Sequence, residues 1–225
     1  MHMFEFLDLG KISYESALQI QTEAFETLLK AKSEGRSGKN KLFFCEHDPV
    51  YTLGKSGIKS NLLVSESQLK EKGILFYETN RGGDITYHGP GQITGYPVFD
   101  LEQLGIGLKQ YIELLEETII RFLALFDVEG KRLNKATGVW LEPETPKARK
   151  ICAIGVKSSR FVTMHGFALN IQTDLSYFSL INPCGFKDKG VTSLANELNR
   201  EVNFDEAKKQ LCCLFQSLFN FPHEI

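Results

Sequence analysis

A glycine-rich stretch at residues 81–92 constrains this sequence more than any other segment, because it places four glycines and one proline between two apolar runs. Such a composition allows positive φ angles and lets the backbone approach a ligand closely. A hairpin of surface turns would explain Gly89, Pro90 and Gly91, but not the ionisable and aromatic side chains that run from Arg81 to His88. Those side chains can direct hydrogen bonds at a ligand. The stretch therefore predicts a ligand-contacting loop next to a strand.

Apolar spacing at a helical period predicts three amphipathic helices, at residues 14–30, 108–126 and 205–219. Ser13 is placed to cap the first of them. Shorter helices are expected near residues 65–72 and 192–198. Apolar runs bounded by glycine or polar residues predict the strands, at residues 42–45, 74–78, 95–101, 138–141, 150–156 and 161–171.

This order of elements predicts an α+β fold, with a mixed, largely antiparallel sheet flanked by helices. The sequence contains no internal repeat, low-complexity tract or linker that would divide it. We therefore expect residues 1–225 to form a single domain. A small C-terminal subdomain could begin near residue 174.

Charge and cysteine content limit the class of protein. The net charge is -2 and the pI is near 6.2, so no broad basic field is available for a nucleic acid. Any acidic protein partner would have to meet a local cluster of lysines. Acidic residues near the N-terminus, and the lack of an apolar run approaching about 18 residues, predict neither an export signal nor a membrane span. Five cysteines without metal-site spacing favour the reducing cytoplasm, with no disulfide framework and no bound metal.

Cys184 is the strongest candidate for a reactive group, because Pro183 and Gly185 on either side predict a turn rather than a packed element. The alternative is an inert turn cysteine. A nucleophilic cysteine needs a nearby group that lowers its pKa. Residue types favour a Cys/His pair, yet sequence spacing does not choose the partner. The candidates are His47, His88, His165 and Lys150.

Four motifs, at residues 81–92, 150–156, 165–170 and 183–185, together closely resemble the octanoyl-acyl-carrier-protein:protein N-octanoyltransferases, also called lipoate-protein ligase B. Residues 47–54 fit the same family, so the resemblance extends from about residue 4 to about residue 198. It implies the catalytic core that is shared with biotin and lipoate protein ligases, in agreement with the α+β pattern.

The resemblance also implies an activity and partners. The expected enzyme moves an octanoyl group from acyl carrier protein to a lysine of a lipoyl domain, as the first step of endogenous protein lipoylation, without a metal or another cofactor. The donor would be octanoyl-acyl carrier protein. The acceptors would be the lipoyl domains of 2-oxoacid dehydrogenase E2 subunits and the glycine cleavage H protein. We expect a cytoplasmic monomer.

Carried over residue by residue, the family's acyl-thioester cysteine corresponds to Cys184, and the lysine that lowers its pKa corresponds to Lys150. The resemblance thus replaces the expected Cys/His pair with a Cys/Lys pair, for which Lys157 is a nearby alternative lysine. Small residues in the substrate-binding segments would leave a tunnel for the acyl chain, and their backbone N–H groups could stabilise the thioester oxyanion. The implied substrate-binding residues are Arg81, Gly82, Gly83, Asp84, Ile85, Thr86, Tyr87, His88, Ala153, Ile154, Gly155, Gly166, Phe167 and Ala168.

Three other functions remain open on sequence grounds. A lipoate or biotin ligase of the same fold would activate its acid with ATP and would not need Cys184. A cysteine hydrolase would release free octanoate. A protein that only binds lipoyl domains would have no use for a thiol held in a turn.

Overall fold

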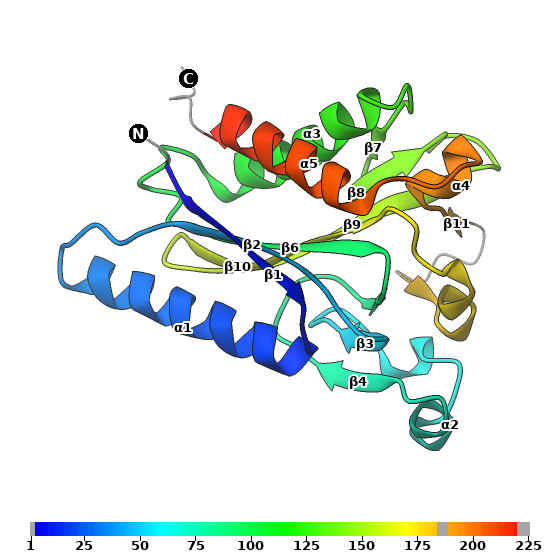
Figure 1. Ribbon diagram of the computed structural model, residues 1–225. Helices are drawn as coiled ribbons and strands as arrows, with labels where there is room; N and C mark the ends of the chain where they lie inside the picture. The colour runs from blue at the N-terminus through cyan, green and yellow to red at the C-terminus, as the bar shows by residue number, and fades with distance from the viewer. Residues whose placement is uncertain (1–2, 184–188, 220–225) are drawn as a thin grey trace.

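The computed structural model describes residues 3–183 and 189–219 (Figure 1). Within these residues, an eight-stranded sheet forms the middle layer, in the order β1-β2-β6-β10-β9-β8-β7, with β11 paired to β9. Helix α1 covers one face of this sheet, and α3 and α5 cover the other (Figure 1). A second sheet, with the order β4-β3-β5, lies beyond one end of α1. The fold is therefore α+β, as the sequence predicts.

The bounds of the elements are as follows. The large sheet contains β1 (Glu5–Lys11), β2 (Lys41–Glu46), β6 (Gln92–Val98), β7 (Lys131–Leu133), β8 (Ala136–Leu141), β9 (Arg149–Ser159), β10 (Val162–Asn170) and β11 (Gly190–Val191), and the small sheet contains β3 (Val50–Leu53), β4 (Leu75–Glu78) and β5 (Ile85–His88). The helices are α1 (Tyr14–Ser33), α2 (Glu66–Glu71), α3 (Leu108–Ala124), α4 (Leu194–Leu198) and α5 (Phe204–Phe219), with 3-10 turns η1 (Lys59–Asn61) and η2 (Leu175–Leu180).

Antiparallel pairing dominates both sheets. The parallel pairs among the described strands are β1 with β2, β9 with β11, and β3 with β4. The mixed, largely antiparallel sheet that the sequence predicts is thus confirmed.

The predicted helices are confirmed to within a few residues, because local signals determine their ends. Helix α1 begins at Tyr14, where the Ser13 hydroxyl accepts a hydrogen bond from the Ser16 backbone N–H at 3.2 Å. Ser65 caps α2 in the same way, and the Gln68 side chain in turn accepts a hydrogen bond from the Ser65 backbone N–H. Helix α3 presents the predicted apolar stripe to the sheet, and Leu115 and Ile119 on that stripe are fully buried.

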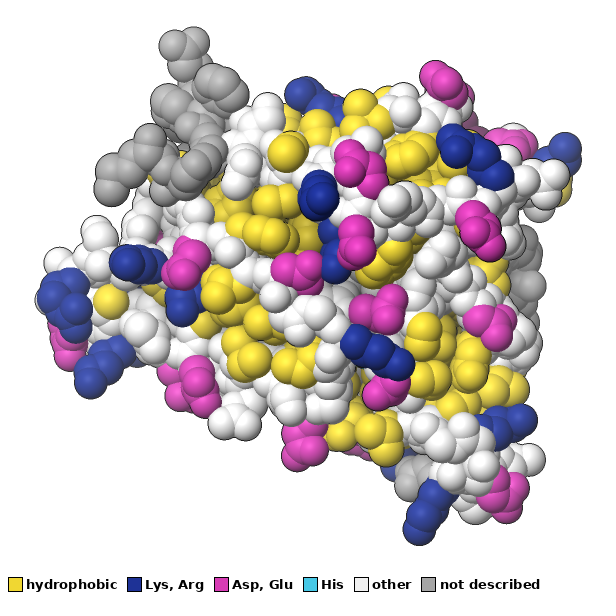
Figure 2. All heavy atoms as spheres, in the orientation of Figure 1, with side chains coloured by type: hydrophobic (Ala, Val, Ile, Leu, Met, Phe, Trp, Pro, Cys, Tyr) yellow, Lys and Arg dark blue, Asp and Glu magenta, His cyan; other side chains and the backbone are white. Residues whose placement is uncertain are grey.

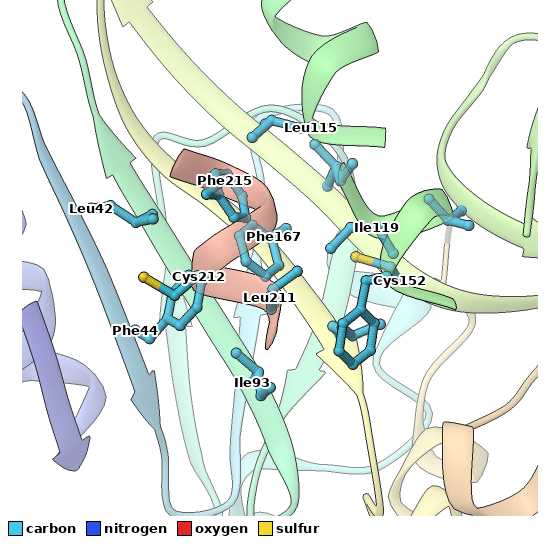
Figure 3. Close-up of a cluster of buried hydrophobic side chains, with 14 of the residues drawn as sticks. Leu42, Phe44, Ile93, Leu115, Ile119, Cys152, Phe167, Leu211, Cys212 and Phe215 are labelled. Atoms are coloured by element: carbon cyan, nitrogen blue, oxygen red, sulfur yellow. The ribbon is translucent and has the colours of Figure 1, made fainter. Parts of the chain in front are cut away.

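The main hydrophobic core lies between the large sheet and the helices α3 and α5 (Figure 3). Phe167 of β10 is central to it, since its ring lies 5.8 Å from the ring of Phe44 on β2 and 5.5 Å from that of Phe215 on α5. Burying one such side chain contributes roughly 1.5–3 kcal/mol to stability. Phe167 belongs both to this core and to the lining of a cavity on the other face, so the core directly supports that cavity.

The centre of the sheet also requires close approach of two backbones. A Cβ atom at Gly166 would lie only 2.2 Å from the carbonyl oxygen of Gly95 on the neighbouring strand β6. The residue before it, His165, has a φ of 58°, which is unusual inside a strand. The interior glycine of this motif therefore permits tight packing of backbone against backbone, as the sequence indicates.

The surface agrees with the low net charge. In the view of Figure 2, basic and acidic side chains are intermixed and separated by small apolar patches, so this face presents no field of a single sign. The Lys208 ammonium, for example, lies 2.7 Å from the Asp8 carboxylate. None of the helices within residues 3–183 and 189–219 has the length and apolar character needed to cross a membrane.

Candidate active site

Two adjoining cavities lie between the large sheet and strand β5 of the small sheet. The first, here called the inner cavity, is lined by Arg81, His88, Gly155, His165, Gly166 and Phe167 among others. The second, here called the lysine cavity, is lined by Gln92, Trp140, Lys150, Asn170, Pro183 and Gly190 among others. Thr86, Ala153 and Ala168 line both cavities, so the two spaces meet at small side chains. Together they could hold one extended apolar ligand with its polar end near Lys150.

Most of the residues that the sequence assigns to substrate binding line these cavities or an adjacent outer cleft. Gly82, Gly83, Asp84 and Ile154 line the outer cleft, which Arg81 and Lys150 also border. Tyr87 points elsewhere, because its ring stacks on that of Tyr177 at 4.7 Å within the apolar cluster of the small sheet.

A β-bulge directs Lys150 into the lysine cavity. In β8, Val139 pairs with Cys152 but the next residue, Trp140, pairs with Lys150, so Ile151 is an extra residue on β9. Without a bulge, residues three positions apart in a strand point to opposite faces. With the extra residue, Lys150 and Ala153 line the same cavity.

Aromatic and backbone groups surround the Lys150 side chain. Its ammonium nitrogen lies 4.6 Å from the centre of the Trp140 ring, a cation–π contact. The Trp140 indole N–H donates to the Ala136 carbonyl at 3.0 Å, which sets the orientation of the ring. Gly138 lets β8 approach β9 closely beside the lysine, since a Cβ atom there would lie only 2.5 Å from the Cys152 carbonyl oxygen. The buried Glu116 carboxylate accepts from the Gly138 N–H at 3.0 Å and thereby anchors this part of β8.

Cys184 lies outside the described residues, but the chain on either side of residues 184–188 is described. Pro183 on one side and Gly190 on the other both line the lysine cavity. Strand β11 pairs with the start of β9, where Val191 lies opposite Lys150 and the Thr192 N–H donates to the Lys150 carbonyl at 3.0 Å. The described residues that flank Cys184 therefore meet Lys150 at one cavity.

Arg81 is buried and donates hydrogen bonds both to Thr52 of β3 and to carbonyl groups of its own loop. Its Nη2 donates to the carbonyl oxygens of Thr52 at 2.6 Å and Asp84 at 2.7 Å, and its Nε donates to the Thr52 hydroxyl at 3.2 Å. These bonds tie the glycine-rich loop to strand β3. Arg81 thus shapes the wall of the inner cavity and adds a positive charge close to its histidines.

The three candidate histidines are buried and neutral. Burial lowers the pKa of His165 to about 3, with help from the charges of Arg81 and Lys157. Burial also lowers the pKa of His88 well below its usual value and lowers the pKa of His47. None of the three lines the lysine cavity, whose described wall carries Lys150 instead.

Lys157, the alternative lysine, lies far from Lys150 and the lysine cavity. It lies seven residues further along β9, which corresponds to roughly 20 Å of strand. Its ammonium nitrogen sits 4.8 Å from the centre of the Phe25 ring of α1, and it lines a separate hollow together with Thr79 and Asn80.

Among the lining residues of the lysine cavity that the sequence did not single out are Gln92, Trp140 and Asn170. Gln92 and Asn170 fall inside recognised motifs, and a polar residue at the end of an otherwise apolar strand was the available signal. Trp140 offered no signal beyond strand propensity. No three side chains of His, Cys, Asp or Glu within residues 3–183 and 189–219 gather as they would around a metal ion.

The sequence of this chain is similar to those of known proteins. The family model for the lipoyl protein ligase A/B catalytic domain matches residues 13–216. An octanoyltransferase of Parabacteroides distasonis is 68% identical over 220 residues, covering 97% of this chain and 100% of the relative. An octanoyltransferase of Bacteroides thetaiotaomicron is 55% identical over 214 residues, covering 95% and 94% of the two chains.

Solved structures share the fold at low identity. A bipartite lipoate protein ligase of the archaeon Thermoplasma acidophilum superimposes with a TM-score of 0.72 at 16% identity, covering 98% of this chain and 85% of the other. A lipoate-protein ligase A bound with ATP superimposes with a TM-score of 0.68, also at 16% identity, over 97% and 85% of the two chains.

Proposed function

Because the chain belongs to the lipoyl protein ligase A/B catalytic-domain family and is an enzyme of octanoyl transfer in protein lipoylation, we propose that it works through a Cys184 acyl-thioester assisted by Lys150. The donor is octanoyl-acyl carrier protein. The acceptors are lysines of lipoyl domains, in 2-oxoacid dehydrogenase E2 subunits and in the glycine cleavage H protein. The reaction takes place in the cytoplasm and needs no cofactor.

One observation carries the proposal: the lysine cavity joins Lys150 to the described residues on both sides of Cys184. Pro183 and Gly190 line it, and β11 is hydrogen-bonded along the start of β9. Cys184 directly follows Pro183 in the sequence. The three buried histidines, by contrast, lie outside the lining of this cavity.

In the first half-reaction, the Lys150 ammonium group stabilises the thiolate form of Cys184. The thiolate attacks the carbonyl carbon of the octanoyl thioester, and the bond from that carbon to the carrier sulfur breaks. The departing carrier thiolate takes a proton from Lys150. The products are a Cys184 thioester, free carrier thiol and a neutral lysine, and the exchange of one thioester for another is close to thermoneutral.

In the second half-reaction, the neutral amine of the acceptor lysine attacks the same carbonyl carbon. An amide bond forms, the bond from carbon to the Cys184 sulfur breaks, and Lys150 takes the surplus proton of the amine. The enzyme returns to its starting thiolate and ammonium forms. Lys150 therefore serves as a proton donor in one step and a proton acceptor in the other.

The inner cavity provides a place for the acyl chain. It shares the small residues Thr86, Ala153 and Ala168 with the lysine cavity, and the acyl chain would extend past them from one cavity to the other. Each methylene group that enters contributes roughly 0.8 kcal/mol of binding free energy. Because one methylene is a weak discriminator, we expect preference for eight carbons rather than strict selection.

The decisive experiment is intact-mass analysis after mixing the protein with octanoyl-acyl carrier protein in the absence of ATP. We expect an octanoyl adduct that maps to Cys184 and that disappears when a lipoyl domain is added, with octanoyl-lysine as the product. An adduct on another residue, or transfer that requires ATP, would contradict the proposal. Release of free octanoate in place of transfer would identify a hydrolase.

A matched pair of variants tests the lysine. Lys150→Ala should slow formation of the adduct by about 10²-fold or more, since it removes the proton carrier of both steps. Lys157→Ala changes the same residue type on the same strand and should acylate at close to the wild-type rate. If the two variants behaved alike, Lys150 would have no special role.

A further inference from the structure

A line of buried hydrogen bonds begins at Arg81 and leads toward the lysine cavity. The Arg81 guanidinium donates to the Thr52 hydroxyl oxygen from Nη2 at 2.9 Å. The Thr52 hydroxyl lies 3.3 Å from His88 Nε2. Because burial holds the pKa of His88 well below its usual value, the ring is neutral and carries a single N–H. With Nε2 accepting from Thr52, that N–H is on Nδ1 and donates to Gln92 Oε1 at 2.9 Å.

These bonds determine the orientation of the next two amides. Gln92 Oε1 accepts from His88, so Gln92 Nε2 is the donor, and it bonds to the Tyr87 carbonyl at 3.1 Å and to Asn170 Oδ1 at 2.9 Å. Asn170 Oδ1 therefore accepts, and Asn170 Nδ2 donates to the Thr192 carbonyl at 3.0 Å. Each donor in the line points the same way, from the charged guanidinium toward Asn170.

One N–H of the Asn170 side-chain amide is not donated to any described residue. A side-chain amide nitrogen carries two hydrogens, and the Thr192 carbonyl is the acceptor for one of them. No second acceptor is present among residues 3–183 and 189–219. Asn170 is only 3% exposed, and it lines the lysine cavity with Lys150 and Ala168. A buried side-chain donor with an available N–H thus borders the lysine cavity, in which the proposed reaction of the thioester takes place.

The sheet limits the backbone N–H groups of β10 that could donate a hydrogen bond into the lysine cavity. Residues 166–168 of β10 lie between β9 on one side and β6 on the other, with Phe167 paired to both Ile154 and Gly95. In a central strand, the backbone N–H groups are taken up by the two neighbours. An oxyanion that forms in the lysine cavity therefore gains little from the backbone N–H groups of β10, and a side-chain donor on the described wall of the cavity is available to it.

We propose that Asn170 donates this hydrogen to the carbonyl oxygen of the octanoyl thioester in the lysine cavity, where negative charge develops during both half-reactions. The inference rests on the proposed function and adds a catalytic residue to it. The cationic start of the line at Arg81 polarises the successive bonds, which makes the last amide a stronger donor. Arg81, Thr52, His88 and Gln92 act as positioning residues for Asn170.

The test is an isosteric substitution, Asn170→Asp, which replaces the donor with an acceptor. We expect acylation by octanoyl-acyl carrier protein, followed by rapid quench and intact mass, to slow by about 10²–10³-fold, as is typical when an oxyanion donor is removed. The KM for the carrier should change by less than about twofold, because the donor acts on developing charge. The control is Asn196→Asp, the same change at an exposed residue of α4, which should leave the rate unchanged.

A spectroscopic measurement separates this role from a structural one, since Asn170 also holds Thr192, the residue that follows β11. With octanoyl labelled by ¹³C at its carbonyl, isotope-edited infrared spectra report the thioester stretch in the acyl-enzyme. A donated hydrogen bond lowers that frequency, so Asn170→Asp should move the band to a higher wavenumber than in the wild type and the Asn196→Asp control. If Asn170→Asp does not accumulate as folded protein, Asn170→Ala carries both measurements, because it introduces no charge.

The outcomes are distinct. A wild-type acylation rate in the Asn170 variant would overturn the inference. A slower rate with an unmoved carbonyl band would also overturn it and would assign Asn170 a purely structural role. Absence of any octanoyl adduct in the wild-type protein would refute the proposed function itself, and this inference with it.

Discussion

The buried histidines should make the protein sensitive to mild acid, and His165 offers the cleanest test. This residue is 2% exposed, and its Nε2 is bonded to Asn80 Oδ1 at 2.8 Å. Its Nδ1 has no partner in the described part of the chain. Burial lowers its pKa from 6.5 to about 3 in the folded protein, so the native state keeps the ring neutral.

The direction of the pH effect follows from proton binding. Near pH 5, the unfolded chain binds a proton at His165 and the folded chain does not, so lowering the pH favours unfolding. The stability is fully present above about pH 6.5 and is lost as the pH falls toward about 3. Between about pH 7.5 and about pH 5, His165 alone should cost about 2 kcal/mol. His47 and His88 add losses of the same sign, because burial lowers their pKa as well.

The perturbation is His165→Asn, which removes the titrating ring and suits the backbone, since asparagine tolerates the φ of 58° at this position. Urea unfolding followed by circular dichroism at several pH values gives the free energy of unfolding. Below about pH 6, the slope of that free energy against pH should be shallower in the variant by about 1.4 kcal/mol per pH unit. Coincident slopes for the two proteins, whatever their absolute stabilities, would show that His165 does not cause the loss of stability in acid.

Two further predictions concern the centre of the sheet and the surroundings of the lysine. Gly166→Ala would place a Cβ atom 2.2 Å from the Gly95 carbonyl, so it should reduce the free energy of unfolding in urea by about 1–3 kcal/mol. Gly107→Ala, where an added Cβ meets nothing within 4 Å, should cost less than about 1 kcal/mol, and equal losses would contradict the close-packing argument. Trp140→Leu removes the ring under Lys150, a contact worth about 0.5–2 kcal/mol, and should slow adduct formation by several-fold, with Trp140→Phe in between. An unchanged rate in Trp140→Leu would show that the ring does not position the ammonium group.

The helices and most strands could be predicted from the sequence because their signals are local. Ser13 caps α1 through an atom only three residues away, and the apolar stripe of α3 reports directly which side of the helix is buried. The α+β class followed from the order of these elements. The family motifs went further, since they singled out Lys150 and Cys184 where spacing alone left several partners open.

Tertiary structure decided which of these residues meet. Lys150 shares a cavity with Ala153 because β8 leaves Ile151 unpaired, and no feature of the strand's own sequence predicts that bulge. The side chain of Asn170 is oriented by Gln92, which is 78 positions away in the chain. Such contacts depend on how strands align across the sheet, whereas sequence patterns report only each residue's neighbours along the chain.

The charge of the histidines likewise depends partly on the sequence and partly on the tertiary structure. The sequence shows three histidines that could partner a thiol, and an isolated imidazole titrates near pH 6.5. Folding buries His47, His88 and His165, and the loss of water lowers the pKa of each one. Residue type thus determines which chemistry is available, while the atoms that the fold packs around a side chain determine its charge and the group that it can reach.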